Sequence, residues 1–596
     1  MLIERRRSAF TPAFIARIAI AWVLVCAVLI ATRWGLASNG TFPDPDDIMR
    51  LMQVRDLIAG QSWFDTTQYR VDAPNGGVPM HWSRLVDVPI ALIILTLSPF
   101  VGIASAQTAA IVIVPLLTLA IAMVLCARIA WRLLGNEEAT LTAMVMAISV
   151  PVLFQFGPMR IDHHGWQIVC ALAAVNGLMA RSDRTGGRIV GISLAFWLAI
   201  SIEGLPLSAI VFAVLALRWA HRRNDYVALV SAINSLFLTS AVLFLATRGV
   251  GDLSTACDAI GPVHLAMFGW AAAVLTAVSR IRPLAPGLVL GGMTLAGGGA
   301  IALLFLGAPQ CGSGAGFDAL DPIVTQFWHA RVLEGMPIWR QNIDVALQYI
   351  VPPAIGLFAA INLAGRSRDW LRRFWREYVV ILCGALIISI FVARAGAVAC
   401  VLAAPPLAWQ VRSWLHSIRS MERPLPRVAA IASVALALVP TMPVLLFTSA
   451  IPATAQNDGM LAAAPSAGES QCRMEEAGAV LLQYAPGEVF APLDIAPYLL
   501  FSEHSVIATS HHRGNDGMRF LIETSIGPVA EARRALSARG TDYVALCPEL
   551  IEPQIYSAAA PDGFVASLLK DEAPEWLEPL PVTNRSTLRL WRVRDE

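Results

Sequence analysis

Hydrophobic residues occur in long blocks along the first 450 positions of the chain, and short segments rich in arginine separate them. Several blocks are nearly free of charge and about as long as a helix that spans a bilayer, namely residues 14–34, 111–126, 284–306 and 428–446. The first block follows three arginines at 5–7 and lacks a small-residue cleavage site, so we expect an anchor and not a cleaved signal peptide. The pattern predicts a polytopic α-helical membrane protein.

The arginines predict a topology because basic residues favour cytoplasmic loops. They gather in seven clusters, at residues 5–7, 128–132, 181–188, 218–223, 280–282, 366–376 and 412–427. Keeping every cluster inside requires two helices between successive clusters and one after the last, which gives about thirteen transmembrane helices. We expect them near residues 13–35, 107–127, 138–156, 166–181, 187–203, 205–219, 226–247, 262–279, 284–307, 344–365, 377–394, 396–411 and 427–449.

One apolar stretch, at about 88–104, is left over, because a further span would place the later arginines outside. We therefore expect it to lie in the membrane interface or against the bundle. Residues 1–450 would form the membrane domain, with a cytoplasmic N-terminus, in a bacterial inner membrane. Residues 451–596 would form a periplasmic soluble domain, whose alternating strand and helix signals predict an α/β fold. The external segments are then residues 37–105, 157–166 and 308–343.

Four of the nine cysteines fall outside the expected helices. Cys257 and Cys311 lie in two external loops, and Cys472 and Cys547 lie in the C-terminal domain. Two pairs in an oxidising compartment favour two disulfides, Cys257–Cys311 and Cys472–Cys547.

The overall composition agrees with a membrane protein. Charged residues make up 15% of the chain and hydrophobic residues 56%, whereas soluble domains carry about 25% charged residues. The formal net charge of +1 argues against a nucleic-acid partner, for which a basic face would be expected.

Ionisable residues gather at the external ends of the expected helices, where such groups usually mark function. They are Asp46, Asp47 and His81 in the first external segment, Asp162, His163 and His164 in the second, Glu334 in the third, and Glu203 and Arg394 at two helix ends. The oxygens of Asp46 and Asp162 and the imidazole of His164 suit a divalent cation such as Mg²⁺ or Mn²⁺. Such a cation and Arg394 would neutralise a phosphate leaving group, with Glu334 as a further ligand or a base.

Each of these residues also has an ordinary structural interpretation. The aspartates that precede a helix are typical N-terminal caps. Residues 162–164 read equally well as a solvated loop in which one histidine is structural, and Glu334 as a solvated charge. Arg394 could snorkel to lipid headgroups, and Glu203 could cap a broken helix. The joint placement on one side of the membrane is what favours a shared site.

The order and spacing of these segments resemble the catalytic subunits of oligosaccharyltransferases, the GT-C membrane glycosyltransferases of bacterial and archaeal N-glycosylation. The resemblance covers most of the chain. The segments that carry it are Asp46-Asp47 with a helix ending in Arg55-Asp56 and Gly60, then Trp63-Phe64-Asp65, residues 78–82, residues 84–87, Asp162-His163-His164, residues 332–337 around Glu334, and Arg394-Ala395-Gly396.

The resemblance implies roles for individual residues. Asp46, Asp162 and His164 would bind the metal, with Asp47 in place of Asp46 if the register differs by one. Glu334 would contact the acceptor or the metal shell. Arg394, together with His81, would bind the donor phosphate.

Two departures from the family pattern bear on the substrates. The Trp-Trp-Asp-Tyr-Gly motif, which reads the acceptor, is expected near residues 491–496, where only Asp494 matches. The family often has a second arginine four residues after the first, and Val398 occupies that position here.

The sequence therefore predicts a metal-dependent inverting glycosyltransferase. It would move a sugar or oligosaccharide from polyprenyl phosphate or pyrophosphate to a glycan, lipid or protein acceptor on the periplasmic side, in contact with membrane lipids. The alternative is a polyprenyl-phosphate-monosaccharide transferase that modifies a lipid or surface polysaccharide. A transporter of lipid-linked glycans is less favoured, because its ionisable groups would lie near mid-membrane on repeated, broken helices.

Overall fold

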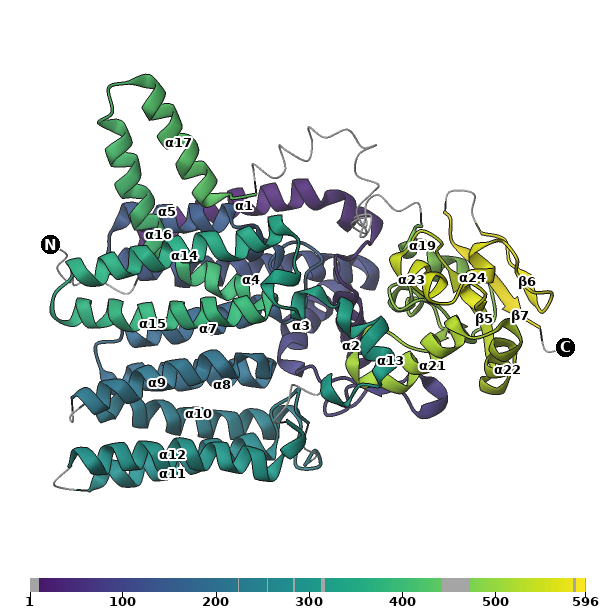
Figure 1. Cartoon of the computed structure of the whole chain (residues 1–596), viewed down its shortest axis with the longest axis horizontal. Helices are drawn as coiled ribbons and strands as arrows, with labels where there is room; N and C mark the ends of the chain where they lie inside the picture. Colours follow the sequence, from purple (N-terminus) through teal and green to yellow (C-terminus); the bar gives the residue numbers. More distant parts are fainter. Residues whose placement is uncertain are drawn as a thin grey trace.

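A computed structural model describes residues 10–222, 225–253, 256–281, 285–311, 317–441, 472–582 and 586–594. The helices of the first part are α1 (Pro12–Asn39), α2 (Pro45–Ile58), α3 (Arg84–Val101), α4 (Ile103–Leu133), α5 (Asn136–Ile148), α6 (Val150–Phe154), α7 (His164–Leu178), α8 (Asp183–Ile200), α9 (Leu205–His221), α10 (Tyr226–Thr247), α11 (Pro262–Arg280), α12 (Pro286–Gly307), α13 (Pro322–Phe327), α14 (Ile343–Arg366), α15 (Asp369–Phe391), α16 (Gly396–Arg419) and α17 (Pro424–Leu438). Most of them run side by side in one bundle (Figure 1).

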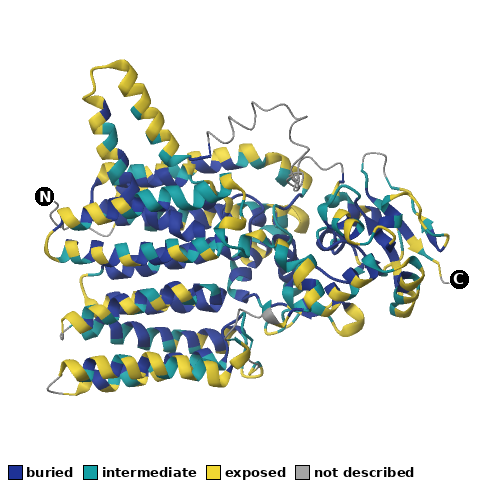
Figure 2. Cartoon of the chain, viewed as in Figure 1, coloured by how far each residue is buried: buried dark blue, intermediate teal, exposed yellow. Residues whose placement is uncertain are grey.

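The bundle has the surface of a membrane protein. Within the described residues, nine helices are long and apolar enough to cross a membrane: α1, α3, α4, α9 with the turn before it, α10, α11, α12, α14 and α15. Large apolar side chains are exposed on outer helices, for example Leu306 of α12 at 83% (Figure 2). Contiguous exposed apolar surface is unfavourable in water and is suited to lipid.

Some expected spans differ from the helices that form. Residues 138–156 divide into α5 and α6 at Ser149, and α7 has only 15 residues. The leftover stretch at 88–104 falls in α3, which packs against α4 across a one-residue turn at Gly102 and is itself long enough to span. The last expected span, 427–449, overlaps α17, but its residues 442–449 and the expected domain boundary at 450 lie outside the described residues. The count of thirteen stays a prediction.

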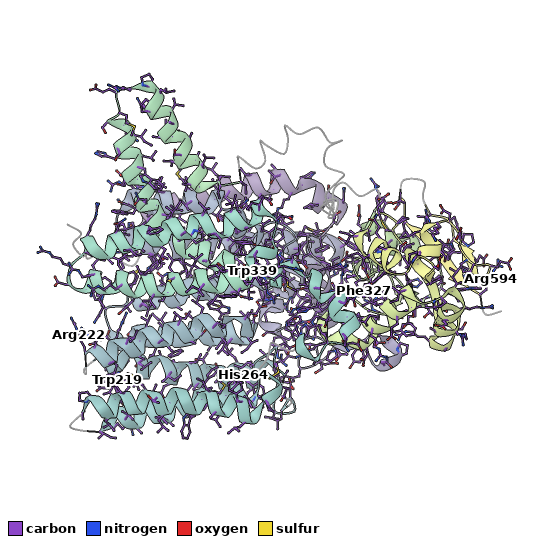
Figure 3. All side chains as sticks on the ribbon, viewed as in Figure 1. Trp219, Arg222, His264, Phe327, Trp339 and Arg594 are labelled. Atoms are coloured by element: carbon purple, nitrogen blue, oxygen red, sulfur yellow. A yellow bond between two sulfur atoms is a disulfide. The ribbon has the colours of Figure 1, made fainter. Side chains whose placement is uncertain are left out.

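Loops that were expected on one side of the membrane do meet at one end of the bundle. Arg373 pairs with Asp225 at 3.0 Å, and Arg412 pairs with Glu137 at 2.6 Å. Figure 3 places Arg222 at this end, opposite the C-terminal domain, whereas Phe327 lies at the junction with that domain. The loops that carry four of the clusters, at 128–132, 218–223, 366–376 and 412–427, thus meet at one end of the bundle.

The C-terminal domain is an α/β unit built on a five-stranded sheet. Its elements are α19 (Met474–Leu481), β3 (Glu488–Phe490), α20 (Ala496–Leu499), β4 (Ser505–Val506), α21 (Asn515–Ile526), α22 (Val529–Arg539), β5 (Thr541–Leu546), α23 (Ile551–Ala559), α24 (Phe564–Leu569), β6 (Leu577–Pro579) and β7 (Arg589–Val593). The strand order is β4-β3-β5-β7-β6, with β3 parallel to both neighbours and β7 antiparallel to both of its own. Cys472 and Cys547 are bonded within this domain.

The domain is docked on the first external segment. The backbone N–H of Val506 donates to the carbonyl of Arg70 at 2.8 Å, and the N–H of Asp72 donates to the carbonyl of Val506 at 2.9 Å, so this segment extends the sheet edge at β4. The N–H of Phe42 donates to the hydroxyl of Tyr498 at 3.0 Å. Apolar residues of both parts, such as Met52 and Leu499, share one buried cluster. The ends of the bundle helices therefore face the domain across this junction.

Candidate active site

Three aspartates at the start of α2 have three different roles. Asp44 is the N-cap, and its Oδ1 accepts a hydrogen bond from the backbone N–H of Asp46 at 3.0 Å. Pro45 follows at the first helical position, where its missing N–H costs nothing. Asp47 is fully buried, and Asp46 lines a pocket at the end of the bundle. The cap interpretation is therefore right for Asp44 and leaves Asp46 facing the pocket.

Asp47 holds the second external segment in place. Its Oδ1 accepts hydrogen bonds from the backbone N–H groups of Ile161 and Asp162, both at 2.8 Å. Its Oδ2 lies 2.9 Å from Nη1 of Arg160, and the same nitrogen lies 2.7 Å from Asp44. Burial raises the pKa of Asp47 to about 7, although Arg160 opposes the shift. Asp47 thus positions the loop.

Asp162 has two oxygens in different surroundings. Oδ1 accepts a hydrogen bond from Nη2 of Arg50 at 3.1 Å and lies 2.7 Å from Nδ1 of His163. Oδ2 is buried and has no hydrogen-bond partner in the described part of the chain, and Nε2 of His164 lies 3.5 Å away. Although burial opposes ionisation, the imidazoles of His163 and His164 and the Arg50 guanidinium hold the pKa of Asp162 well below its usual range.

Arg394 is held between two carboxylates. It belongs to the short turn η8 (Ala393–Ala395), where α15 gives way to α16. Its Nη2 lies 2.7 Å from Glu203, and its Nη1 lies 3.4 Å from Glu334. Glu203 is on the turn η2 (Ile202–Gly204) before α9, and Glu334 is on η6 (Leu333–Gly335) of the long external segment. Arg394 therefore joins three segments that are far apart in sequence.

These side chains converge on one small polar cavity of about 80 Å³. Seven residues that the sequence predicts for the site line this cavity: Asp46, His81, His163, His164, Glu203, Glu334 and Arg394. Asp162 lies directly behind it, in contact with His163 and His164. Of the residues predicted for the site, Asp47 and Asp162 do not line the cavity, and Asp47 is engaged instead with residues 160–162.

An apolar cavity of about 290 Å³ adjoins the polar one. The two share His164, Glu203 and Arg394. The apolar cavity extends between helices and is lined by Trp197, Pro206, Leu207, Ala385, Ile388, Val392 and Val398. Val398 thus contributes an apolar wall where the resembling family often has a second arginine.

The polar cavity has donors that fit a metal ion. One ligand atom each from Asp162, His163 and His164 lie within 4.8 Å of one another. The buried Oδ2 of Asp162 lacks any other described partner. Burial and the carboxylates of Asp44, Asp162 and Glu334 raise the pKa of Asp46 well above its usual range, the behaviour of carboxylates that are crowded without a counterion. Asp46 lies outside this group of three ligand atoms but lines the same cavity.

Several residues that matter here were not singled out in the sequence. Arg50 bridges Asp162 and Asp87, with Nη1 at 3.2 Å from Asp87, and its guanidinium lies over the Trp82 ring. Arg84 also pairs with Asp87 at 3.2 Å. This network is completely buried and fixes the orientation of Asp162 from behind. A charged residue within an amphipathic helix gives no sequence signal for such a contact, because its partners come from distant segments.

His81 contacts the C-terminal domain. Its Nδ1 lies 2.9 Å from Nε2 of His511, and its carbonyl accepts a hydrogen bond from Arg248. His511 and His512 come from the loop after β4 of the C-terminal domain, and both line the cavity. The domain therefore supplies part of the cavity wall.

No protein-family model and no curated protein matches this chain. Among solved structures, it is similar to the archaeal oligosaccharyltransferase AglB from Archaeoglobus fulgidus in complex with an inhibitory peptide and a dolichol-phosphate, with a TM-score of 0.63, 15% identity, and coverage of 95% of this chain and 72% of that chain. The same archaeal enzyme in complex with Zn and sulfate gives a TM-score of 0.61, 14% identity, and coverage of 97% and 73%.

A third structure of that archaeal enzyme, tethered to an acceptor peptide containing the NVT sequon, also gives a TM-score of 0.61, with 14% identity and coverage of 95% and 72%. At these identities the likeness concerns the fold. It confirms the architecture expected from the sequence: the chain is polytopic and α-helical with a C-terminal α/β domain, and its fold is similar to that of the oligosaccharyltransferase AglB.

Proposed function

We propose that this chain is a GT-C glycosyltransferase that moves a sugar or oligosaccharide from a polyprenyl phosphate or pyrophosphate to an acceptor outside the cytoplasm. One observation carries the proposal: carboxylates, imidazoles and an arginine from six segments that are distant in sequence line one polar cavity, which adjoins an apolar one. A lipid-linked phosphate needs both environments side by side. The archaeal enzyme of the same fold was solved with a dolichol-phosphate.

The donor phosphate would contact Arg394 and His81. Arg394 lies where the two cavities meet, so a phosphate bound there would leave its lipid chain among Leu207, Ile388 and Val398. A guanidinium presents paired donors to phosphate oxygens and stays charged at all relevant pH values. In the free protein Glu203 and Glu334 neutralise it, and the donor would replace the longer of these two contacts.

A divalent cation would be held by Asp162 and His164, with Asp46 completing the set from α2. Such an ion supplies positive charge to the phosphate as it leaves. The imidazole in this set also suits Zn²⁺, so these metal ligands do not select Mg²⁺ or Mn²⁺ alone. Arg50 and Asp47 act by positioning: the first orients Asp162, and the second fixes the backbone of residues 160–162.

The acceptor would enter near Glu334. This carboxylate is half-exposed in the cavity and reaches only one partner, Arg394, at 3.4 Å in the described structure. It is free to accept a proton from, or to orient, the attacking group. A single displacement needs one such base and no covalent intermediate, which gives inversion at the sugar.

A monosaccharide transferase is the second candidate. The segment 491–496 that faces the first external segment lacks both tryptophans of the family's acceptor motif, and Val398 replaces the second arginine. Both differences favour a smaller donor or a non-peptide acceptor. A transporter is less favoured, because the ionisable groups lie at the domain end of the bundle. For either transferase we place the N-terminus in the cytoplasm and the C-terminal domain in the periplasm of a bacterial inner membrane.

The test is transfer by the purified full chain from a radiolabelled donor in detergent. Donors are a polyprenyl-phosphate monosaccharide and a polyprenyl-pyrophosphate oligosaccharide, which separate the two candidates. Asp46→Asn and Glu334→Gln should each lower transfer more than 100-fold, and EDTA should abolish it until a divalent cation is restored. Glu523→Gln, on the exposed face of α21, serves as the matched control. Full activity in both cavity variants would refute the proposal.

A further inference from the structure

A second cluster of histidines lies at the junction between the bundle and the C-terminal domain. His81 precedes α3, whereas His511 and His512 come from the domain, at the start of the turn η10 (His512–Gly514). One ring nitrogen from each of the three lies within 4.8 Å of the other two. The closest pair, Nδ1 of His81 and Nε2 of His511, is 2.9 Å apart. His511 is buried, at 3% exposure, and the other two are half-buried.

We propose that His81, His511 and His512 form a binding site for a transition-metal ion of the zinc type. Three imidazoles without a carboxylate in the group favour Zn²⁺ over Mg²⁺, which prefers oxygen ligands. Zinc binds imidazole nitrogen at about 2.0–2.1 Å, so two such ligands in a tetrahedral site lie about 3.3 Å apart. The closest pair needs to separate by only a few tenths of an ångström to admit the ion.

Asp258 provides the outer support that zinc-bound histidines usually have. Its Oδ2 lies 2.6 Å from Nε2 of His512, which leaves Nδ1 of His512 for the ion. Arg513 fixes Asp258 in turn with two hydrogen bonds of 2.7 Å. A carboxylate on the far ring nitrogen sets the tautomer and orientation of a metal-binding histidine. The neighbouring Cys257 is bonded to Cys311, so this loop is also held covalently.

Binding the ion through Nδ1 of His81 would keep the remaining proton of this imidazole on Nε2, where it can donate to a phosphate. The site is separate from the group of Asp162, His163 and His164, although the histidines of both groups line the same cavity.

An ion here would tie three parts of the protein together: the first external segment, the disulfide-bonded loop at 257 and the C-terminal domain. In the described structure one hydrogen bond joins His81 to His511, and Asp258 joins its loop to the domain through His512 and Arg513. Three metal–nitrogen bonds would clamp the domain against the cavity more firmly. This inference does not depend on the proposed glycosyl transfer.

The experiment is titration of the metal-free full chain in detergent with Co²⁺ alone, which reports its ligands through visible absorption, and with Zn²⁺ measured by elemental analysis. We expect two bound ions in the wild type. His511→Gln and His512→Gln should each remove one ion and the cobalt band of an imidazole-rich site, whereas Asp162→Asn should remove only the other ion. His416→Gln, at the far end of the bundle, should change neither.

Asp258→Asn keeps all three ligands and weakens their support, so it should lower the affinity of this ion about 10- to 100-fold. It provides the test if a histidine variant fails to fold. The proposal is overturned if the wild type binds a single ion that only Asp162→Asn removes. It is equally overturned if the variants at 258, 511 and 512 bind cobalt with wild-type affinity and spectrum.

Discussion

At the scale of single residues, Asp162 is held tightly behind the cavity by its contacts with His163 and His164. One oxygen is used by Arg50 and His163, and the other is buried without a described hydrogen bond. A buried polar atom without a partner costs about 1–3 kcal/mol. The folded protein tolerates this cost, which supports a role for the free oxygen in binding a ligand.

The substitution Asp162→Asn tests that role with little change of shape. The amide oxygen still accepts from Arg50, but the negative charge that would bind a cation is lost. We expect transfer to fall more than 100-fold and stability to fall by about 1–3 kcal/mol, because Arg50 loses one of two charged partners. Rates and thermal unfolding are measured beside Asp183→Asn, an exposed control at the start of α8. Transfer within threefold of wild type would exclude a role in the reaction.

Arg394 should affect donor binding more than the acceptor. Lysine at this position keeps the charge but loses the fork that contacts Glu203 and Glu334. Each lost charge-assisted hydrogen bond is worth about 1.5–3 kcal/mol, so Arg394→Lys should raise the donor KM about 10- to 100-fold, and Arg394→Gln more. The acceptor KM should stay near wild type, as should both values in the exposed control Arg340→Lys. An unchanged donor KM would place the phosphate elsewhere.

At the scale of elements, α2 shows what sequence patterns resolve and what they leave open. From the sequence, the aspartates at 44–47 could either cap the helix or belong to a functional site. In the structure Asp44 caps the helix, Asp47 holds the loop at 160–162, and Asp46 lines the cavity. Consecutive residues on a helix point about 100° apart, so only one of them faces a given neighbour. Sequence alone does not give the rotation of the helix, which is set by packing against α3 and the C-terminal domain.

The C-terminal helix α23 carries a buried acid whose titration is measurable. Burial, and then the carboxylate of Asp494, raise the pKa of Glu552 to about 8, and its Oε1 accepts a hydrogen bond from Tyr556 at 2.7 Å. The folded domain therefore keeps a proton that the unfolded chain releases near its ordinary pKa. This stabilisation is complete below about pH 4.5 and is lost as pH rises towards 8.

Glu552→Gln removes this dependence. We expect the variant to be more stable than wild type at pH 8, by on the order of 4 kcal/mol, and close to wild type at pH 4.5. The measurement is thermal unfolding of the full chain at the two pH values, followed by a signal from the domain. Glu531→Gln on α22, which is exposed, controls for a change in surface charge. An equal difference at both pH values would show that Glu552 is ionised in the folded domain.

At the scale of the whole molecule, arginine placement predicted a great deal. It predicted that the loops at 218–223 and 366–376 lie at the same end of the bundle, and the ion pair between Arg373 and Asp225 agrees with this. The polytopic fold was also confirmed. It did not reveal the histidine cluster or the Arg50–Asp87 network. Hydropathy reports where a helix crosses the bilayer, whereas these contacts depend on how a separate domain docks. That docking has no periodic signal in the sequence.

The adjoining cavities lead to a prediction about the lipid part of the donor. Each buried methylene stabilises binding by about 0.8 kcal/mol, so the donor KM should fall as the polyprenyl chain lengthens. It should then level off, because an apolar cavity of about 290 Å³ holds only the first part of the chain and the rest lies in membrane. A series of synthetic donors with one to eleven isoprene units measures this dependence in detergent.

The residue that tests the cavity itself is Val398, which is buried in its wall. Val398→Trp fills part of the space, so it should raise the KM of long donors and leave the shortest donor nearly unchanged. Val242→Trp, on the lipid-facing side of α10, adds the same side chain outside the cavity and should have no effect on either. If both donors lost affinity equally, the substitution would have disturbed the phosphate site near Arg394. If neither did, the lipid chain would follow another path out of the polar cavity.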